Sequence, residues 1–170
     1  MKKSFYKLIL AGLFAAVIYI TTAFISIPLG IGYANLGDCF VLFSGMFLGP
    51  LYGFGAAAVG SALADITLGW IYYAPVTFFV KGFMALIFGM FMKKTRKPLL
   101  ASVVSGIICE IIMVASYFVF ELCLYGSGAF ATVPWNLVQG AVGLGGAIVL
   151  CSTAKKLRLD GKFYNKPDRI

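Results

Sequence analysis

The sequence predicts an all-α, polytopic membrane protein that forms one six-helix transmembrane bundle. Hydrophobic residues make up 61% of the 170 residues and charged residues only 12%, whereas a soluble domain is about half apolar and a quarter charged. The apolar residues lie in runs near the length of a spanning helix, about 20 residues. These runs lack the two-residue alternation of an outer-membrane barrel. A soluble domain with an oversized core is the weaker alternative.

The first three expected helices cover residues 5–26, 37–48 and 51–68. The first has an apolar run too long for the core of a cleaved signal peptide. The second is short for a span and is expected to tilt little or to cross where the protein is thin. It begins beside Asp38, after the outer loop GIGYANLG, and the carboxylate is expected to cap the helix. The third contains GFGAAAVGSALA, whose small residues allow close helix packing.

The last three expected helices cover residues 75–92, 99–124 and 131–154, and a basic tail follows over 155–170. Pro75 restarts the chain as a helix after an outer loop. The sixth helix opens with ATVPWNLVQG and contains the glycines of GAVGLGGA. No linker and no clear repeat separates the runs, so residues 1–170 are expected to form a single integral membrane domain.

The basic residues predict the orientation of the bundle. All of the 14 lysines and arginines except Lys81 lie at the N-terminus, in KKTRK at 93–97, or in the tail. Six spans place these three segments on one side, which the positive-inside rule makes cytoplasmic. Both termini are therefore expected in the cytoplasm. The net charge of +8 is expected to meet anionic lipid headgroups and calls for no nucleic-acid partner.

Residues for metal, redox or catalytic chemistry are not recognisable in the sequence. The chain has no histidine, and no nucleophile lies beside a base. The cysteines are Cys39, Cys109, Cys123 and Cys151. They have no metal-binding or redox spacing and are expected to be small core residues. We therefore expect no enzyme activity, cofactor or metal site.

Five ionisable residues lie within the apolar segments: Asp38, Asp65, Lys81, Glu110 and Glu121. Each costs a few kcal/mol or more in a bilayer, so such groups face a cavity, form pairs or serve a function. The first three are expected to converge on the outer half of the bundle. Asp65 and Lys81 are either a structural ion pair or ligand contacts. Glu110, at about mid-depth, is either a pocket floor or a hydrogen-bonding residue within its helix, and the role of Glu121 stays open.

Aromatic and amide side chains accompany these charges on the outer side. Trp70, Tyr72 and Tyr73 belong to an outer loop. They are either interfacial belt residues or, for the two tyrosines, a stacking wall with hydrogen-bonding tips. Asn136 and Gln139 are three residues apart in the first turns of the sixth helix, so they share a face and need polar partners.

The segment from residue 35 to residue 82 resembles the signature region of the substrate-binding S components of energy-coupling factor (ECF) transporters. It is most similar to the group that includes the riboflavin, hydroxymethylpyrimidine and pyridoxine carriers. The six-run layout is similar from end to end, but the specific motifs lie only in this segment. They are NLGD at 35–38, GP at 49–50 with Gly53, GSALAD at 60–65, and YAP at 73–75 with Thr77, Lys81 and Gly82.

The resemblance implies a vitamin-binding subunit of the prokaryotic plasma membrane. Such a subunit works with a transmembrane coupling subunit, the T component, and two cytoplasmic ATP-binding cassette subunits. It binds vitamin from outside and topples in the membrane to release it inside. The chain contains no GxxxxGK[ST] phosphate loop, so ATP hydrolysis is expected from the partners.

The resemblance also implies two sets of residues. Ala11 and Ala15 match the small-residue motif by which such proteins meet the coupling subunit, although packing within the chain's own bundle is an open alternative. The outward pocket is expected to bind vitamin through Asn35, Asp38, Asp65, Tyr72, Tyr73, Thr77, Lys81, Asn136 and Gln139.

A flat, polar heteroaromatic ligand suits a pocket of this composition. The smaller rings of pyridoxine and hydroxymethylpyrimidine are favoured, and riboflavin would need more aromatic wall. Additional aromatic wall for riboflavin is available from Trp70, Phe78, Phe79 and Trp135.

The alternative function is a stand-alone ion- or proton-coupled transporter that uses the intramembrane carboxylates as a relay.

Overall fold

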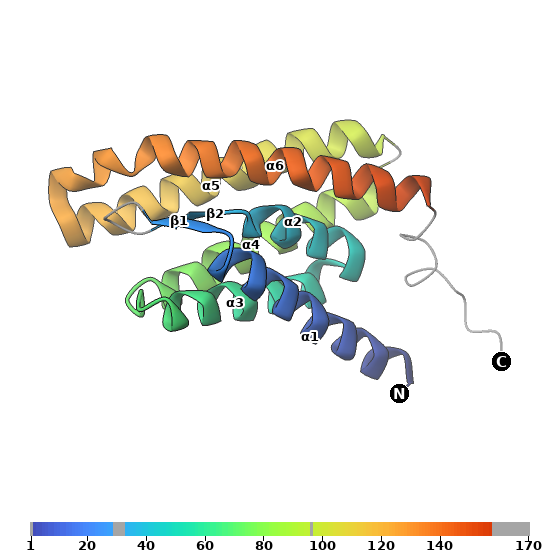
Figure 1. The fold of residues 1–170 in the computed structure, drawn as a ribbon. Coiled ribbons are helices and arrows are strands. Elements are labelled where there is room, and N and C mark those ends of the chain that lie inside the picture. The colour runs from blue at the N-terminus through green and yellow to red at the C-terminus, as the bar shows by residue number, and fades with distance from the viewer. Residues whose placement is uncertain (1, 29–32, 96, 158–170) are drawn as a thin grey trace.

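The structure, a computed structural model, describes residues 2–28, 33–95 and 97–157, and six long helices dominate it (Figure 1). The described elements are, in chain order, α1 (Lys2–Ala23), β1 (Ser26–Pro28), β2 (Tyr33–Asn35), α2 (Gly37–Leu48), α3 (Pro50–Thr67), α4 (Ala74–Lys94), α5 (Pro98–Tyr125), the 3₁₀ helix η1 (Gly126–Ala131) and α6 (Val133–Lys156). The helix ends lie within three residues of the predicted ends.

Proline begins four of these helices. Pro50, Pro75, Pro98 and Pro134 lie in the first two positions of α3, α4, α5 and α6. The ring fixes φ at a helical value, and its missing N–H costs little because the first N–H groups have no partner within a helix. Gly49 joins α2 directly to α3 with a φ of 86°, a conformation that glycine adopts without strain.

The first outer loop contains a short antiparallel hairpin that the sequence analysis did not predict. Ser26 of β1 pairs with Asn35 of β2, and Ile27 pairs with Ala34. α1 ends at Ala23 rather than at residue 26, and the chain enters β1 at Ser26. The hairpin brings the side chains of β2 to the outer end of the bundle.

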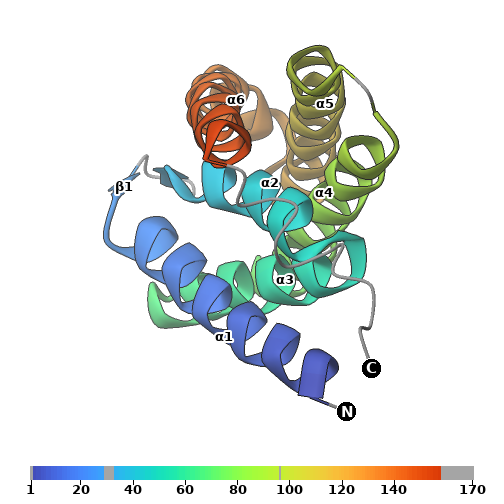
Figure 2. The ribbon, with the colours of Figure 1, turned by 90° about the vertical axis from the view of Figure 1, so that its right-hand side faces the viewer.

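The helices form a bundle whose middle layer is α2 and α4 (Figure 2). α5 and α6 lie side by side on one flank, and α1 and α3 lie on the other. The hairpin, η1 and the α3–α4 turn are at one end, and the start of α1, the α4–α5 turn and the end of α6 are at the opposite end (Figure 1). The basic segments that the structure describes therefore share one end, as their charge predicts.

Four of the described helices, α1, α4, α5 and α6, are long and apolar enough to cross a membrane. The second helix is short, as expected, because α2 has 12 residues and is only about 18 Å long, less than the roughly 30 Å apolar core of a bilayer. Large apolar side chains such as Leu51 and Ile111 are exposed, whereas Asp38 and Lys81 are buried. This distribution is that of a multi-pass integral membrane protein.

Glycines allow the inner helices to meet backbone to backbone. A Cβ atom on Gly45 of α2 would lie 2.0 Å from the carbonyl oxygen of Ala85 in α4, and one on Gly53 of α3 would lie 2.6 Å from the Cα of Gly45. A Cβ on Gly60 would lie 2.5 Å from the carbonyl oxygen of Ala15 in α1. The small residues of the third run therefore pack within the bundle.

Candidate functional site

A narrow polar cavity of about 40 Å³ lies between the helices at the hairpin end. Most of the predicted site residues line it: Asn35, Asp65, Tyr73, Thr77, Lys81, Asn136 and Gln139. Trp70, which the sequence offered only as aromatic wall for a larger ligand, also lines it. The predicted set of binding residues did not include Thr22, Tyr33, Ser61, Tyr117, Glu121 and Thr132, which line it as well. They come from the end of α1, the hairpin, α3, α5 and the residue before α6.

A buried ion pair joins α4 to α2 beside this cavity. The ammonium Nζ of Lys81 donates to Oδ1 of Asp38 at 2.5 Å, and the two side chains are 3% and 0% exposed. Of the two alternatives for Asp65 and Lys81, the structural ion pair between them is therefore not formed, because Lys81 pairs with Asp38, and contact with a ligand stays a prediction. Asp65 lines the same cavity, and Lys81 also lies over the ring of Tyr117, with Nζ 5.4 Å from the ring centroid, as in a cation–π contact.

A chain of amide hydrogen bonds continues from this pair to the hairpin. Nε2 of Gln139 donates to Oδ2 of Asp38 at 2.7 Å, and Oε1 of Gln139 accepts from the backbone N–H of Asn35 at 3.0 Å. Oδ1 of Asn35 accepts from the N–H of Gly37 at 2.8 Å. The side chain that accepts from the first N–H group of α2 is thus that of Asn35. The expectation that Asp38 caps this helix is wrong, because its carboxylate binds Lys81 and Gln139 instead.

A second contact holds the hairpin to α3. The phenol of Tyr33 donates to Oδ1 of Asp65 at 2.5 Å. Burial, and then the nearby charge of Asp65, raises the pKa of the Tyr33 phenol above its ordinary value of 10.0. The phenol therefore keeps its proton and remains the donor across physiological pH.

Glu121 joins three segments at the outer rim of the cavity. Its Oε1 accepts from the phenol of Tyr73 at 3.2 Å, and its Oε2 accepts from the hydroxyl of Thr132. The carboxylate thereby connects α5 with the start of α4 and the start of α6. The sequence placed Glu121 near the outer end of its helix but gave no signal for these partners, which are 48 and 11 residues away.

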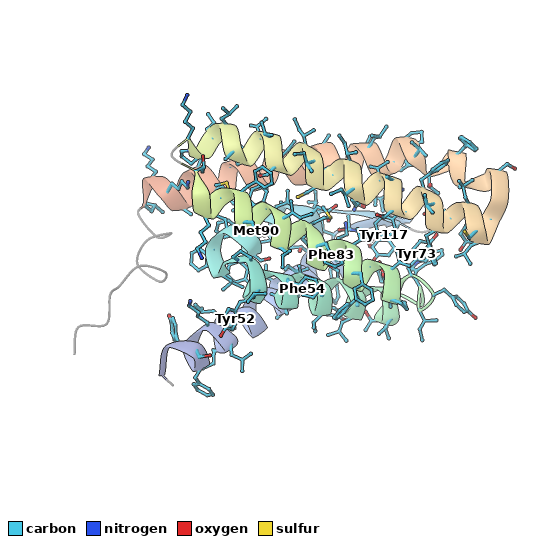
Figure 3. All side chains as sticks on the ribbon, turned by 180° about the vertical axis from the view of Figure 1, so that it is seen from behind. Tyr52, Phe54, Tyr73, Phe83, Met90 and Tyr117 are labelled. Carbon is cyan, nitrogen blue, oxygen red and sulfur yellow. The ribbon has the colours of Figure 1, made fainter. Side chains whose placement is uncertain are left out.

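The aromatic wall differs from the predicted one. Trp70 packs edge-on against Tyr73, with ring centroids 5.8 Å apart, and Tyr73 lies beside Tyr117 at 6.3 Å; Figure 3 shows these two tyrosines at the same end of the bundle. Tyr72 does not join them, because its side chain is 79% exposed. Neighbouring positions in the α3–α4 turn point in different directions, so Tyr73 enters the cavity and Tyr72 does not.

Four polar atoms at the cavity have no hydrogen-bond partner in the part of the chain that the structure describes. They are Oγ1 of Thr22, Oγ of Ser61, Oδ2 of Asp65 and Nδ2 of Asn136. A buried polar atom without a partner costs about 1–3 kcal/mol. Donors and acceptors that are left open around a cavity are typical of a site that receives a polar ligand.

The predicted docking residues of α1 face the bundle. Ala11 is 9% exposed, and Ala15 contacts Gly60 of α3. The neighbouring small residues Gly12 and Ala16 are exposed instead, and a Cβ on Gly12 would meet nothing within 4 Å. Ala11 is thus buried and Ala15 is partly buried against α3 in the isolated chain, and their role in docking stays a prediction.

A family model for the S component of ECF-type riboflavin transporters matches residues 2–156. The chain belongs to this family. As an ECF S component, it is a membrane-embedded, substrate-binding subunit of a vitamin transporter and is not an enzyme.

Two further similarities accompany this match. A Pyrococcus woesei protein described as "uncharacterized protein in gap 3'region" is 37% identical over 124 residues, which span 71% of this chain and 80% of that protein. The structure of the S component of a bacterial ECF transporter superposes with a TM-score of 0.68 at 20% identity and covers 94% of this chain and 99% of that one. The latter similarity shows that the two proteins share the fold.

Proposed function

We propose that the polar cavity at the hairpin end captures a flat, uncharged heteroaromatic vitamin or precursor from outside the cell. The observation that carries the proposal is the set of open polar atoms around an aromatic-walled cavity, on Thr22, Ser61, Asp65 and Asn136. Ring faces would stack on Trp70 and Tyr73, and ring substituents would bond to the open donors and acceptors.

The ligand must enlarge the cavity when it binds. A volume of about 40 Å³ holds roughly three water molecules and no vitamin ring. The hairpin is the element best placed to move, because hydrogen bonds to two side chains attach its second strand to the helices. Tyr33 binds Asp65 of α3, and Asn35 binds Gln139 of α6. We infer that these bonds open for entry and close over the ligand.

Calorimetric titration of the purified protein with riboflavin, pyridoxine and hydroxymethylpyrimidine tests the proposal. The family description names riboflavin, and the small cavity favours the two smaller rings. Tight binding of one compound supports capture at this site if Asn136→Leu, which removes an open donor, weakens it. A parent protein that binds none of them would refute the vitamin assignment.

We propose further that the exposed face of α1 meets the transmembrane coupling subunit, which carries the two ATPases. Gly12 and Ala16 are small and exposed on this face, and Leu8, Leu13 and Ile20 surround them. Such a surface permits close approach of a partner helix. Co-purification with the coupling subunit should fall for Gly12→Leu, with ligand binding unchanged, whereas Ala11→Leu should instead destabilise the isolated subunit.

Transport assays separate this function from a stand-alone transporter. We expect uptake only when the coupling subunit and ATPases are co-expressed. Uptake by this chain alone that collapses with the proton gradient would favour the alternative.

A further inference from the structure

Glu110 is a buried carboxyl group that the cavity does not use. Its side chain is 7% exposed, and neither Oε1 nor Oε2 has a hydrogen-bond partner among residues 2–28, 33–95 and 97–157. One side of it lines an apolar groove between α5 and α6. An acidic group in such surroundings is costly, and no hydrogen bond among the described residues compensates for it.

The Asp38–Lys81 pair lies next to this carboxyl group. Glycines of α6 make room for both, because a Cβ on Gly143 would lie 2.6 Å from the Cβ of Asp38 and 3.3 Å from Oε1 of Glu110. Glu110 interacts electrostatically with both members of the pair. An ammonium has three N–H donors, and the hydrogen bond of Lys81 to Asp38 uses one of them.

Both carboxylate oxygens of Asp38 have a partner in the ligand-free structure. Lys81 binds its Oδ1 and Gln139 binds its Oδ2. Because Asp38 is also 0% exposed, a ligand can donate a hydrogen bond to it only if one of these partners moves aside. A displaced Lys81 would be a buried cation without a partner unless a second anion accepts it.

We propose that Glu110 is this second partner: Lys81 exchanges Asp38 for Glu110, and the exchange frees Asp38 to accept a hydrogen bond from the ligand. The flexible four-carbon stem of a lysine allows its ammonium to move between neighbouring carboxylates. Glu110 thereby acts as a positioning residue that determines when Asp38 is open to the ligand. The part of the proposal that concerns the ligand rests on the proposed function.

A thermal-unfolding cycle without ligand tests the exchange itself. We expect Asp38→Asn to lower the melting temperature only slightly, since Glu110 still serves Lys81, and Glu110→Gln to change it little, since Lys81 keeps Asp38. The double variant should melt roughly 3–12 °C below the sum of the single shifts, and the excess should vanish in a Lys81→Met background. Shifts that simply add would overturn the exchange.

A second double variant keeps the cycle decisive if the first does not fold. Asp38→Asn combined with Glu110→Asp retains a carboxylate and should recover a folded protein. If it fails to fold as well, a carboxylate at position 110 does not support Lys81, and the exchange is refuted.

Ligand titration tests the remaining part. Glu110→Gln should weaken vitamin affinity by about 10- to 100-fold, whereas Met113→Leu, at a fully buried position one turn further along α5, should change it little. Equal affinity of the parent and Glu110→Gln would overturn the role of Glu110 in ligand binding. If the cycle shows coupling but the parent binds no vitamin, the exchange stands and the proposed function fails.

Discussion

Replacement of Lys81 by methionine is the sharpest test of the buried pair. The substitution keeps most of the side-chain volume but removes the donor that lies 2.5 Å from Oδ1 of Asp38, a carboxylate with 0% exposure. Breaking a buried pair from one side costs about 3–5 kcal/mol. For a chain of this length, each kcal/mol lowers the melting temperature by roughly 2–4 °C, so Lys81→Met should melt roughly 6–20 °C below the parent.

The assay is thermal unfolding of the protein in lipid nanodiscs, followed by tryptophan fluorescence. Asp38→Asn added to Lys81→Met removes the stranded charge and should restore most of the lost stability. Lys97→Met, at an exposed position, is the matched control and should change stability by less than about 1 kcal/mol. A Lys81→Met protein that melts within about 1 °C of the parent would show that the two charges do not form a buried pair.

Three further substitutions probe the hairpin, the aromatic wall and the helix packing. Tyr33→Phe removes the hydrogen bond to Asp65 and should weaken ligand binding about 10-fold or more by calorimetry. Because the pKa of the Tyr33 phenol is raised, the parent should lose no affinity between pH 7 and about pH 10. A loss of affinity over this range in the parent but not in Tyr33→Phe would contradict this. Trp70→Phe should abolish most of the ligand-induced change in tryptophan fluorescence, since Trp70 lines the cavity; an unchanged signal would place the ligand elsewhere. Gly45→Ala should cost about 1–3 kcal/mol of stability in thermal unfolding, because its Cβ would lie 2.0 Å from a carbonyl oxygen of α4, whereas Gly12→Ala, with nothing within 4 Å, should cost none.

The buried polar network gives these predictions a common basis. Asp38, Lys81 and Gln139 come from α2, α4 and α6, and the hydrogen bonds among them hold three helices in register. In the apolar interior each bond depends on its neighbours, because a polar group that loses its partner has no water to replace it. A ligand that enters the cavity must therefore exchange partners within the network.

The local features of the chain were predictable because they depend on neighbouring residues. Apolar runs of the length of a helix, prolines at the helix starts and the one-sided placement of lysine and arginine each carry a local physical cause. The short second helix is visible in the sequence for the same reason. The hairpin was not, since its strands are three residues each and carry no period long enough to recognise.

The partners of the buried polar groups depended on contacts between distant parts of the chain. Polarity in an apolar run singled out Asp38, Asp65, Lys81, Glu110 and Glu121, but it did not say which group meets which. The sequence left open whether Lys81 pairs with Asp65, whereas the packing of α2 against α4 supplies Asp38, 43 residues away.

The sequence by itself determined that this chain is a helical membrane protein with costly polar groups toward one end, because composition and run length decide which solvent each segment can tolerate. Only the tertiary structure decided that Tyr73 rather than Tyr72 enters the cavity, and that Ala11 and Ala15 face α3. Those outcomes follow from the rotation of each helix about its axis. Close packing between backbones fixes that rotation, and no single helix carries the information alone.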